Sequence, residues 1–141
     1  MSFSIHPQLL ADCIVLGRLR QCHVLLMNNS GVPWFILVPE NIVDAAEIID
    51  LSEEQQQRVL ADINAVSEFV RAMPEVTKLN TAALGNVVPQ LHIHIVGRNS
   101  GDYCWPKLVW ASDPGPEYEQ ARIDQLRSEL MQAMPALSVA D

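Results

Sequence analysis

Polar and apolar residues alternate strictly along residues 90–95. The odd-numbered positions are all leucine or isoleucine, whereas the even-numbered positions are Gln90, His92 and His94. This period of two is typical of a half-buried β-strand, and it places the two imidazoles roughly 7 Å apart along the chain. We therefore predict a strand that packs through its aliphatic face and directs three polar side chains to the other.

Four further segments have the apolar, β-branched or aromatic composition of strands. They are residues 13–17, 22–27, 33–39 and 76–83. Between the second and the third of these segments stand Asn28 and Asn29, followed by Ser30 and Gly31, and these residue types tolerate turn conformations. These two strands are therefore predicted to form a hairpin.

A long helix is predicted after Ser52, because Gln55 follows it in the spacing of a capping box. Apolar residues then recur in steps of four, three and four from Val59 to Val70, and Pro74 ends the pattern. Shorter or less regular helical patterns occur at residues 7–11, 44–50 and 117–134. The elements together predict an α+β fold with an antiparallel sheet of about five strands, one long helix and a C-terminal helix.

The length and composition are those of one domain with a sizeable core. The chain has 141 residues, of which 49% are hydrophobic, so we expect a single domain over residues 1–141. No signal-peptide pattern opens the sequence, and no run approaches the roughly 20 apolar residues of a membrane span. A soluble, cytoplasmic protein is expected.

Cys13, Cys22 and Cys104 are odd in number and lack C-x-x-C spacing, which favours free buried thiols over disulfides or structural zinc.

The charge balance narrows the range of partners. With 17 acidic and 9 basic residues the formal net charge is −8, and no basic stripe interrupts it. A polyanion such as duplex DNA would be repelled by such a chain. A small phosphorylated ligand stays compatible with this charge, because helix ends and backbone amides bind phosphate without a basic surface.

The polar face of residues 90–95 carries the candidate chemistry. A single histidine in a strand is more often a hydrogen-bonded structural residue than a catalyst, but Gln90, His92 and His94 together are costly to bury without partners. A cleft accounts for them better than a core does. A metal site built on the two histidines is disfavoured, because no third histidine or carboxylate stands at a nearby motif position. We expect neither a metal nor another cofactor.

At these residues the sequence resembles the histidine-triad (HIT) family, whose signature is His-x-His-x-His followed by two apolar residues. The first histidine of the triad is replaced by Gln90, as in a bacterial branch with a Gln-x-His-x-His motif. Trp34 aligns roughly where several members carry a further cleft histidine. The resemblance covers roughly residues 13–110. Its other matching segments are Met27–Asn29, Ile36–Pro39, Lys78–Asn80, Leu84–Asn86 and Trp105–Pro106.

The resemblance implies a HIT-like fold, usually assembled as a two-fold homodimer, and a nucleotide as the small-molecule substrate. It implies a nucleotide phosphohydrolase or nucleotidyl transferase acting on dinucleoside polyphosphates or nucleoside phosphoramidates. His92 takes the position of the nucleophile that forms a covalent nucleotidyl-histidine, and His94 and Gln90 would bond phosphate oxygens. The residues that the resemblance assigns to nucleotide binding are Asn29, Asn80, Asn86 and Trp105. The alternative is a nucleotide-binding regulatory protein with little or no turnover, since the first imidazole of the triad is missing.

Overall fold

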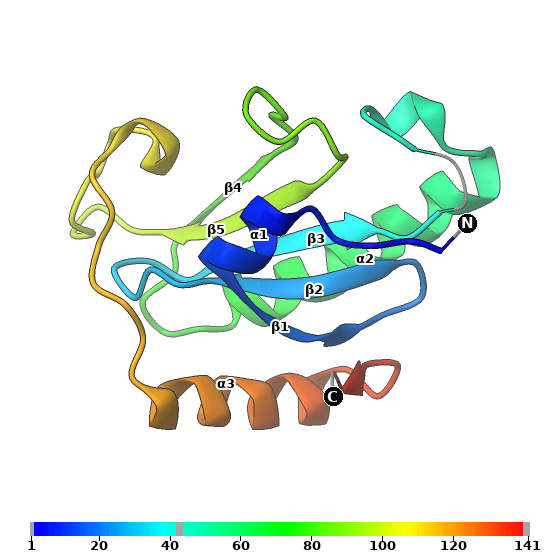
Figure 1. The fold of residues 1–141 in the computed structure, drawn as a ribbon. Helices are drawn as coiled ribbons and strands as arrows, with labels where there is room; N and C mark the ends of the chain where they lie inside the picture. Colours follow the sequence, from blue (N-terminus) through cyan, green and yellow to red (C-terminus); the bar gives the residue numbers. More distant parts are fainter. Residues whose placement is uncertain (1, 42–43, 140–141) are drawn as a thin grey trace.

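The computed structural model describes residues 2–41 and 44–139 (Figure 1). Its helices are α1 (Pro7–Asp12), α2 (Glu53–Arg71) and α3 (Gln120–Ala133), with short 3-10 turns η1 (Ile48–Asp50) and η2 (Val109–Ala111). Its strands are β1 (Cys13–Arg18), β2 (Cys22–Met27), β3 (Trp34–Pro39), β4 (Lys78–Ala82), β5 (Ile93–Arg98) and β6 (Ser138–Val139). The predicted α+β class is confirmed, and no helix within the described residues is both long and apolar enough to cross a membrane.

The strands form one antiparallel sheet in the order β4-β5-β3-β2-β1-β6. The predicted hairpin of residues 22–27 and 33–39 is confirmed as β2 and β3. The sheet has six strands rather than about five, because the two-residue β6 pairs with Gly17 and Arg18 of β1. A strand of two residues is too short to show an alternating pattern, so the sequence did not predict β6.

The strand that carries the histidines begins at Ile93, so Gln90 lies outside it. The prediction that Gln90 shares a strand face with His92 and His94 is therefore wrong. The Leu91 amide donates to the Ala45 carbonyl at 2.8 Å, and the pairing of this segment with β3 begins only at Ile93. His92 stands immediately before the strand, and His94 is its second residue.

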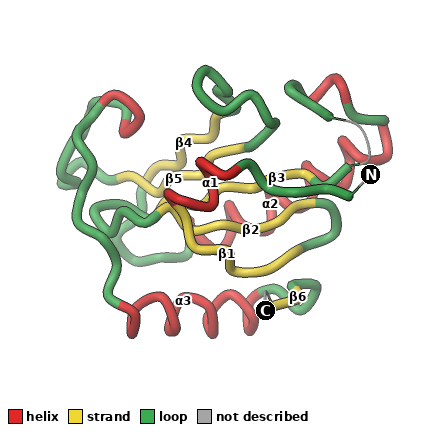
Figure 2. The backbone as a smooth tube through the Cα atoms, viewed as in Figure 1, coloured by secondary structure: helices red, strands yellow, loops and turns green. Residues whose placement is uncertain are grey.

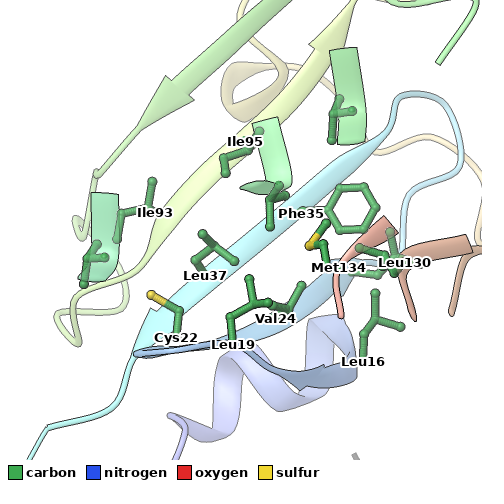
Figure 3. Packing of buried hydrophobic residues seen from close by; sticks show 14 of the residues in the cluster. Leu16, Leu19, Cys22, Val24, Phe35, Leu37, Ile93, Ile95, Leu130 and Met134 are labelled. Carbon is green, nitrogen blue, oxygen red and sulfur yellow. The ribbon is translucent and has the colours of Figure 1, made fainter. Parts of the chain in front are cut away.

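The two faces of the sheet are covered by different elements (Figures 1 and 2). On one face α2 and α3 pack over a large apolar cluster, which includes Ile93 and Ile95 of β5 (Figure 3). The other face carries a smaller cluster formed by α1, η2 and residues of β2, β3 and β5. His94 lies on this second face, opposite in parity to Ile93 and Ile95. Ile93 and Ile95 thus pack into the core under the two helices, whereas His94 between them faces the candidate site.

The predicted capping box at the start of α2 is confirmed. The Ser52 hydroxyl accepts from the Gln55 amide at 3.2 Å, and the Gln55 side chain accepts from the Ser52 amide at 3.0 Å. The predicted helix at residues 7–11 is confirmed as α1, whereas the turn expected at 44–50 is helical only in η1, and the last helix begins at Gln120 rather than residue 117. All three cysteines are free, as expected, and Cys22 and Cys104 are buried, whereas Cys13 is only half-buried.

One buried acid links α2 to the sheet. Asp62 is fully buried, and its carboxylate accepts from the backbone amides of Arg20, Gln21 and Cys22 at 3.3, 2.8 and 3.0 Å. These amides form the turn between β1 and β2. A carboxylate that accepts several backbone N–H groups replaces the water it loses on burial. Asp62 therefore fixes the position of the long helix against the sheet.

We predict that Asp62→Ala lowers the free energy of unfolding by about 3 kcal/mol or more, because three backbone donors lose their acceptor in a buried site. Urea denaturation followed by circular dichroism measures the change. The matched control is Glu68→Gln, which removes an exposed carboxylate from the same helix and should change the free energy by no more than about 0.5 kcal/mol. A loss below about 1 kcal/mol in Asp62→Ala would contradict the structural role.

Candidate active site

The ring of His92 is held in one tautomer. Its Nδ1 lies 2.7 Å from the backbone oxygen of Gln90, and the side chain is only 6% exposed. A carbonyl oxygen can only accept, so Nδ1 carries the proton of the neutral imidazole. Nε2 is therefore left with its lone pair free. This is the protonation state that a histidine needs to attack an electrophile.

The ring of His94 is held in the opposite tautomer. The indole Nε1 of Trp34 donates to His94 Nδ1 at 3.0 Å. Because an indole N–H can only donate, Nδ1 of His94 is unprotonated and its proton resides on Nε2. Burial, assisted by the neighbouring His92, lowers the pKa of His94 to about 4, so the ring is neutral at pH 7.

The two rings lie next to each other, with centroids 4.9 Å apart and planes at 66°. His92 offers an acceptor nitrogen and His94 offers a donor nitrogen. This pairing of opposite hydrogen-bonding character suits a group that presents both an electrophilic centre and an oxygen, as a phosphoryl group does.

A cavity of about 450 Å³ opens beside His94 on the second face of the sheet. Its wall is formed by Ala11, Asp12, Met27, Asn28, Asn29, Trp34, His94, Val109, Trp110, Ser112, Pro114 and Glu117. His92 lies next to this wall rather than on it. A cavity of this size and mixed polarity accommodates a small molecule such as a nucleoside.

Trp110 is a site residue that the sequence did not reveal. Its ring contacts His94 edge-on at a centroid distance of 5.3 Å and lies 6.1 Å from that of Trp34. Its indole Nε1 is buried and finds no acceptor among the described residues. Trp110 stands in an irregular segment without periodicity, so no local pattern distinguished it from ordinary packing.

Asn29, assigned by resemblance to nucleotide binding, lies on the cavity wall and is 3% exposed. Its Nδ2 donates to the Tyr103 hydroxyl at 3.1 Å, and its Oδ1 accepts from the Gly31 amide at 2.9 Å. Tyr103 in turn donates to the Asp113 carbonyl at 3.0 Å. Asn29 is therefore held rigidly by two partners, and Tyr103 is a supporting residue that the sequence did not reveal.

Asn80 lies on β4 and is oriented by a buried arginine. Arg98 is 1% exposed, donates to both carboxylate oxygens of Asp102 at 2.7 and 3.1 Å, and donates to Asn80 Oδ1 at 3.0 Å. The hydrogen bonds with Asp102 raise the pKa of Arg98, so the guanidinium stays cationic. Since a guanidinium only donates, it fixes the Asn80 amide with its oxygen toward Arg98.

The remaining two residues assigned to nucleotide binding lie outside the cavity wall. Asn86 is exposed in the loop after Gly85, whose φ of 73° is a left-handed conformation that glycine adopts without strain. Trp105 is 40% exposed, and its ring lies over Arg98, with the guanidinium carbon 5.4 Å from its centroid. The structure thus gathers His92, His94 and Asn29 and leaves Asn80, Asn86 and Trp105 at the periphery.

Gln90 is held by the N-terminal segment rather than directed toward the histidines. Its Nε2 donates to the Ser4 carbonyl at 2.9 Å, and its Oε1 accepts from the His6 amide at 2.8 Å. Gln90, which the resemblance places at the first position of the triad, therefore reaches His92 through its backbone oxygen. Among the described residues, no group of three or more histidine, cysteine or acidic side chains is placed to hold a metal ion.

Comparison with known proteins shows the family of this chain. The HIT domain model matches residues 9–101. A histidine triad protein from Bradyrhizobium japonicum is 38% identical over 95% of this chain and 99% of its own, with a TM-score of 0.90. A histidine triad protein from Marinobacter aquaeolei VT8 is 40% identical over 98% of this chain and 100% of its own, with a TM-score of 0.90. One from Sinorhizobium meliloti 1021 is 31% identical over 94% of this chain and 97% of its own, with a TM-score of 0.88. No curated protein sequence matches the chain significantly. The chain belongs to the HIT family.

We predict that Gln90→Ala speeds hydrogen exchange of the His6 amide by roughly tenfold, because the change removes two hydrogen bonds that hold the N-terminal segment. Exchange monitored residue by residue by NMR measures the effect. Ser4→Ala is the matched control, since it leaves the Ser4 carbonyl and therefore both bonds in place. Unchanged His6 exchange in Gln90→Ala would show that the segment is held by other contacts.

Proposed function

We propose that the protein is a nucleotide phosphohydrolase or nucleotidyl transferase that acts on dinucleoside polyphosphates or nucleoside phosphoramidates. The observation that carries the proposal is the 2.7 Å contact between His92 Nδ1 and the Gln90 carbonyl, because it leaves His92 Nε2 unprotonated. Membership of the HIT family supports the same class of reaction.

The reaction takes place in two displacements at the α-phosphorus. In the first, the Nε2 lone pair of His92 forms a bond to phosphorus, and the leaving group departs with the electron pair of its broken bond to phosphorus. A phosphate leaving group departs as the anion, and an amine leaving group takes up a proton from solvent. In the second, water or another acceptor attacks phosphorus and releases His92. For water, one O–H proton is lost to solvent as the nucleoside monophosphate forms. The protein supplies the nucleophile, so the covalent step uses this chain's own residues.

The neighbouring residues have separate roles in this proposal. His94, with its proton on Nε2, donates to a phosphate oxygen where negative charge develops in the transition state. Gln90 acts through its backbone oxygen, which holds the proton on Nδ1 of His92 and stabilises the positive charge that develops on the ring. This role differs from that of an amide on phosphate, because both side-chain amide atoms of Gln90 are bonded to the N-terminal segment.

The cavity beside His94 would take the nucleoside. Asn29 would provide a polar contact on its wall, and the indole rings of Trp34 and Trp110 would provide apolar surface. Asn80 would direct its amide nitrogen toward the phosphates, with Asn86 and Trp105 at the edge of the site. A homodimer is the form that the family resemblance predicts.

A second candidate function is nucleotide binding with little turnover. The observation in its favour is the engagement of Gln90, since the position of the first triad histidine contributes no side-chain donor to the cleft. Such a protein would bind nucleotide in the same cavity but would not accumulate a covalent intermediate.

We predict that His92→Gly abolishes the covalent adduct and lowers turnover by at least roughly a thousandfold, because the nucleophile is removed. Nucleotide affinity should stay within a few fold, since His92 acts mainly in the transition state. The measurements are intact mass after incubation with a panel of dinucleoside polyphosphates and nucleoside phosphoramidates, hydrolysis rates, and calorimetric binding.

His23→Gln is the matched control, because it alters a histidine that contacts Phe3 and Glu40 away from the cavity. It should retain adduct formation and turnover. The wild type and His92→Gly could instead bind nucleotide equally, hydrolyse it at the same residual rate and form no adduct. This result would contradict the proposed enzyme activity and favour the nucleotide-binding function.

A further inference from the structure

Trp34 contributes more to the candidate site than an apolar wall. It is the first residue of β3, it is 7% exposed, and its only side-chain polar atom is bonded to His94 Nδ1 at 3.0 Å. The contact joins residues 60 positions apart in the chain. Trp34 therefore places one fixed donor against one nitrogen of a histidine from the HIT motif.

The chemistry of the indole makes this contact directional. An indole N–H donates and never accepts, and it does not titrate in the physiological range. If the proton of neutral His94 moved to Nδ1, two N–H groups would face each other in a buried site and neither would be satisfied. The penalty of an unsatisfied buried donor corresponds to a preference of at least tenfold, by order of magnitude, for the Nε2–H tautomer. A histidine at position 34 could donate or accept and would impose no such preference.

We propose that Trp34 is a positioning residue that locks His94 as an Nε2–H donor and opposes its protonation. The inference rests on the proposed function, in which that N–H donates to a phosphate oxygen. Trp34 does not touch the reacting atoms. Its N–H engages the lone pair of His94 Nδ1, so this nitrogen cannot accept a proton from the substrate or solvent. His94 therefore remains a donor through Nε2 and does not become a general base.

Burial and the neighbouring His92 outweigh the carboxylates near His94 and keep its ring neutral. His92 is the titratable group in contact with it, and Asp12 from α1 and Glu117 from the segment before α3 are the carboxylates on the same cavity wall. Arg98 on β5 is paired with Asp102. Burial and His92 already lower the pKa of His94 to about 4, and the indole N–H acts in the same direction by occupying the site where a second proton would bind.

The cavity contains its own control. Trp110 also packs against His94, with ring planes at 78°, but its Nε1 is not bonded to the imidazole. Trp34→Phe and Trp110→Phe therefore both replace an indole beside His94 with a smaller aromatic ring. Only the first removes the donor to Nδ1.

The test is long-range ¹H–¹⁵N correlation NMR of ¹⁵N-histidine-labelled protein from pH 8 to pH 5. In the wild type we expect His94 to stay neutral with its proton on Nε2 throughout this range. Trp34→Phe should show His94 as a mixture of tautomers with a pKa above that of the wild type, whereas Trp110→Phe should keep the wild-type signature. Nδ1–H or mixed tautomers at His94 in the wild type, or the same response in both variants, would overturn the proposal.

A second measurement needs only the wild-type protein and therefore does not depend on the variants folding. The Trp34 indole proton should show slow solvent exchange and a scalar coupling across the hydrogen bond to His94 Nδ1, and the Trp110 indole proton should show no such coupling. Absence of this coupling at Trp34 would contradict the proposal that Trp34 holds His94 in the Nε2–H tautomer. Both tests report on the ring nitrogens and not on turnover, so they stand even if no adduct forms and the proposed reaction fails.

An activity readout separates positioning from packing. If adduct formation is observed in the wild type, Trp34→Phe should lower its rate most at neutral and alkaline pH, where the Nδ1–H tautomer of His94 lacks the Nε2–H donor. The loss should shrink as pH falls, because the imidazolium form donates from Nε2 in every molecule. A profile parallel to that of the wild type would assign Trp34 to packing alone and contradict the proposal.

Discussion

The hydrogen bond between His92 Nδ1 and the Gln90 carbonyl is the contact on which the candidate site depends. It determines which ring nitrogen is free, and it is formed by a backbone atom whose position follows from several other constraints. The Leu91 amide is bonded to Ala45, and the Gln90 side chain is bonded to the segment before α1. The bend that these contacts create just before β5 brings the carbonyl of one residue against the ring two positions later.

The sheet supplies the second constraint. Apolar residues of β5 are buried under α2 and α3 on one face, which leaves the opposite parity for the histidines on the other. Shifting the strand by one residue would exchange the two faces, so burial of Ile93 and Ile95 fixes where His94 lies. Trp34 enters from the neighbouring strand and sets the proton of His94. The two histidines thus differ in tautomer because their Nδ1 atoms meet a carbonyl in one case and an indole N–H in the other.

Much of this fold follows from local pattern. The alternation at residues 91–95 and the capping box at Ser52 have the period or spacing of one element, and the apolar run at 22–27 is assigned to a strand by its length and the turn residues that follow it. The interactions within the site do not. The contacts of Gln90 with Ser4 and His6, of Asn29 with Tyr103 and of Trp34 with His94 join residues that are far apart in sequence, and no periodicity encodes such pairs. The prediction that Gln90 shares a strand face with His92 and His94 is wrong for this reason, because tertiary partners bond both atoms of its side-chain amide.

The central claim is that His92 carries the nucleotidyl group on Nε2, and the position of the phosphorus–nitrogen bond tests it most directly. The adduct formed with a nucleotide substrate would be trapped by rapid denaturation at alkaline pH, and ³¹P NMR with tandem mass spectrometry would assign the modified residue and nitrogen. The account predicts a single adduct on Nε2 of His92. A phosphorus bond to Nδ1 of His92, or an adduct on His94, would contradict it. In this structure the Nδ1 atoms of both histidines are already hydrogen-bonded, and Nε2 of His94 carries a proton.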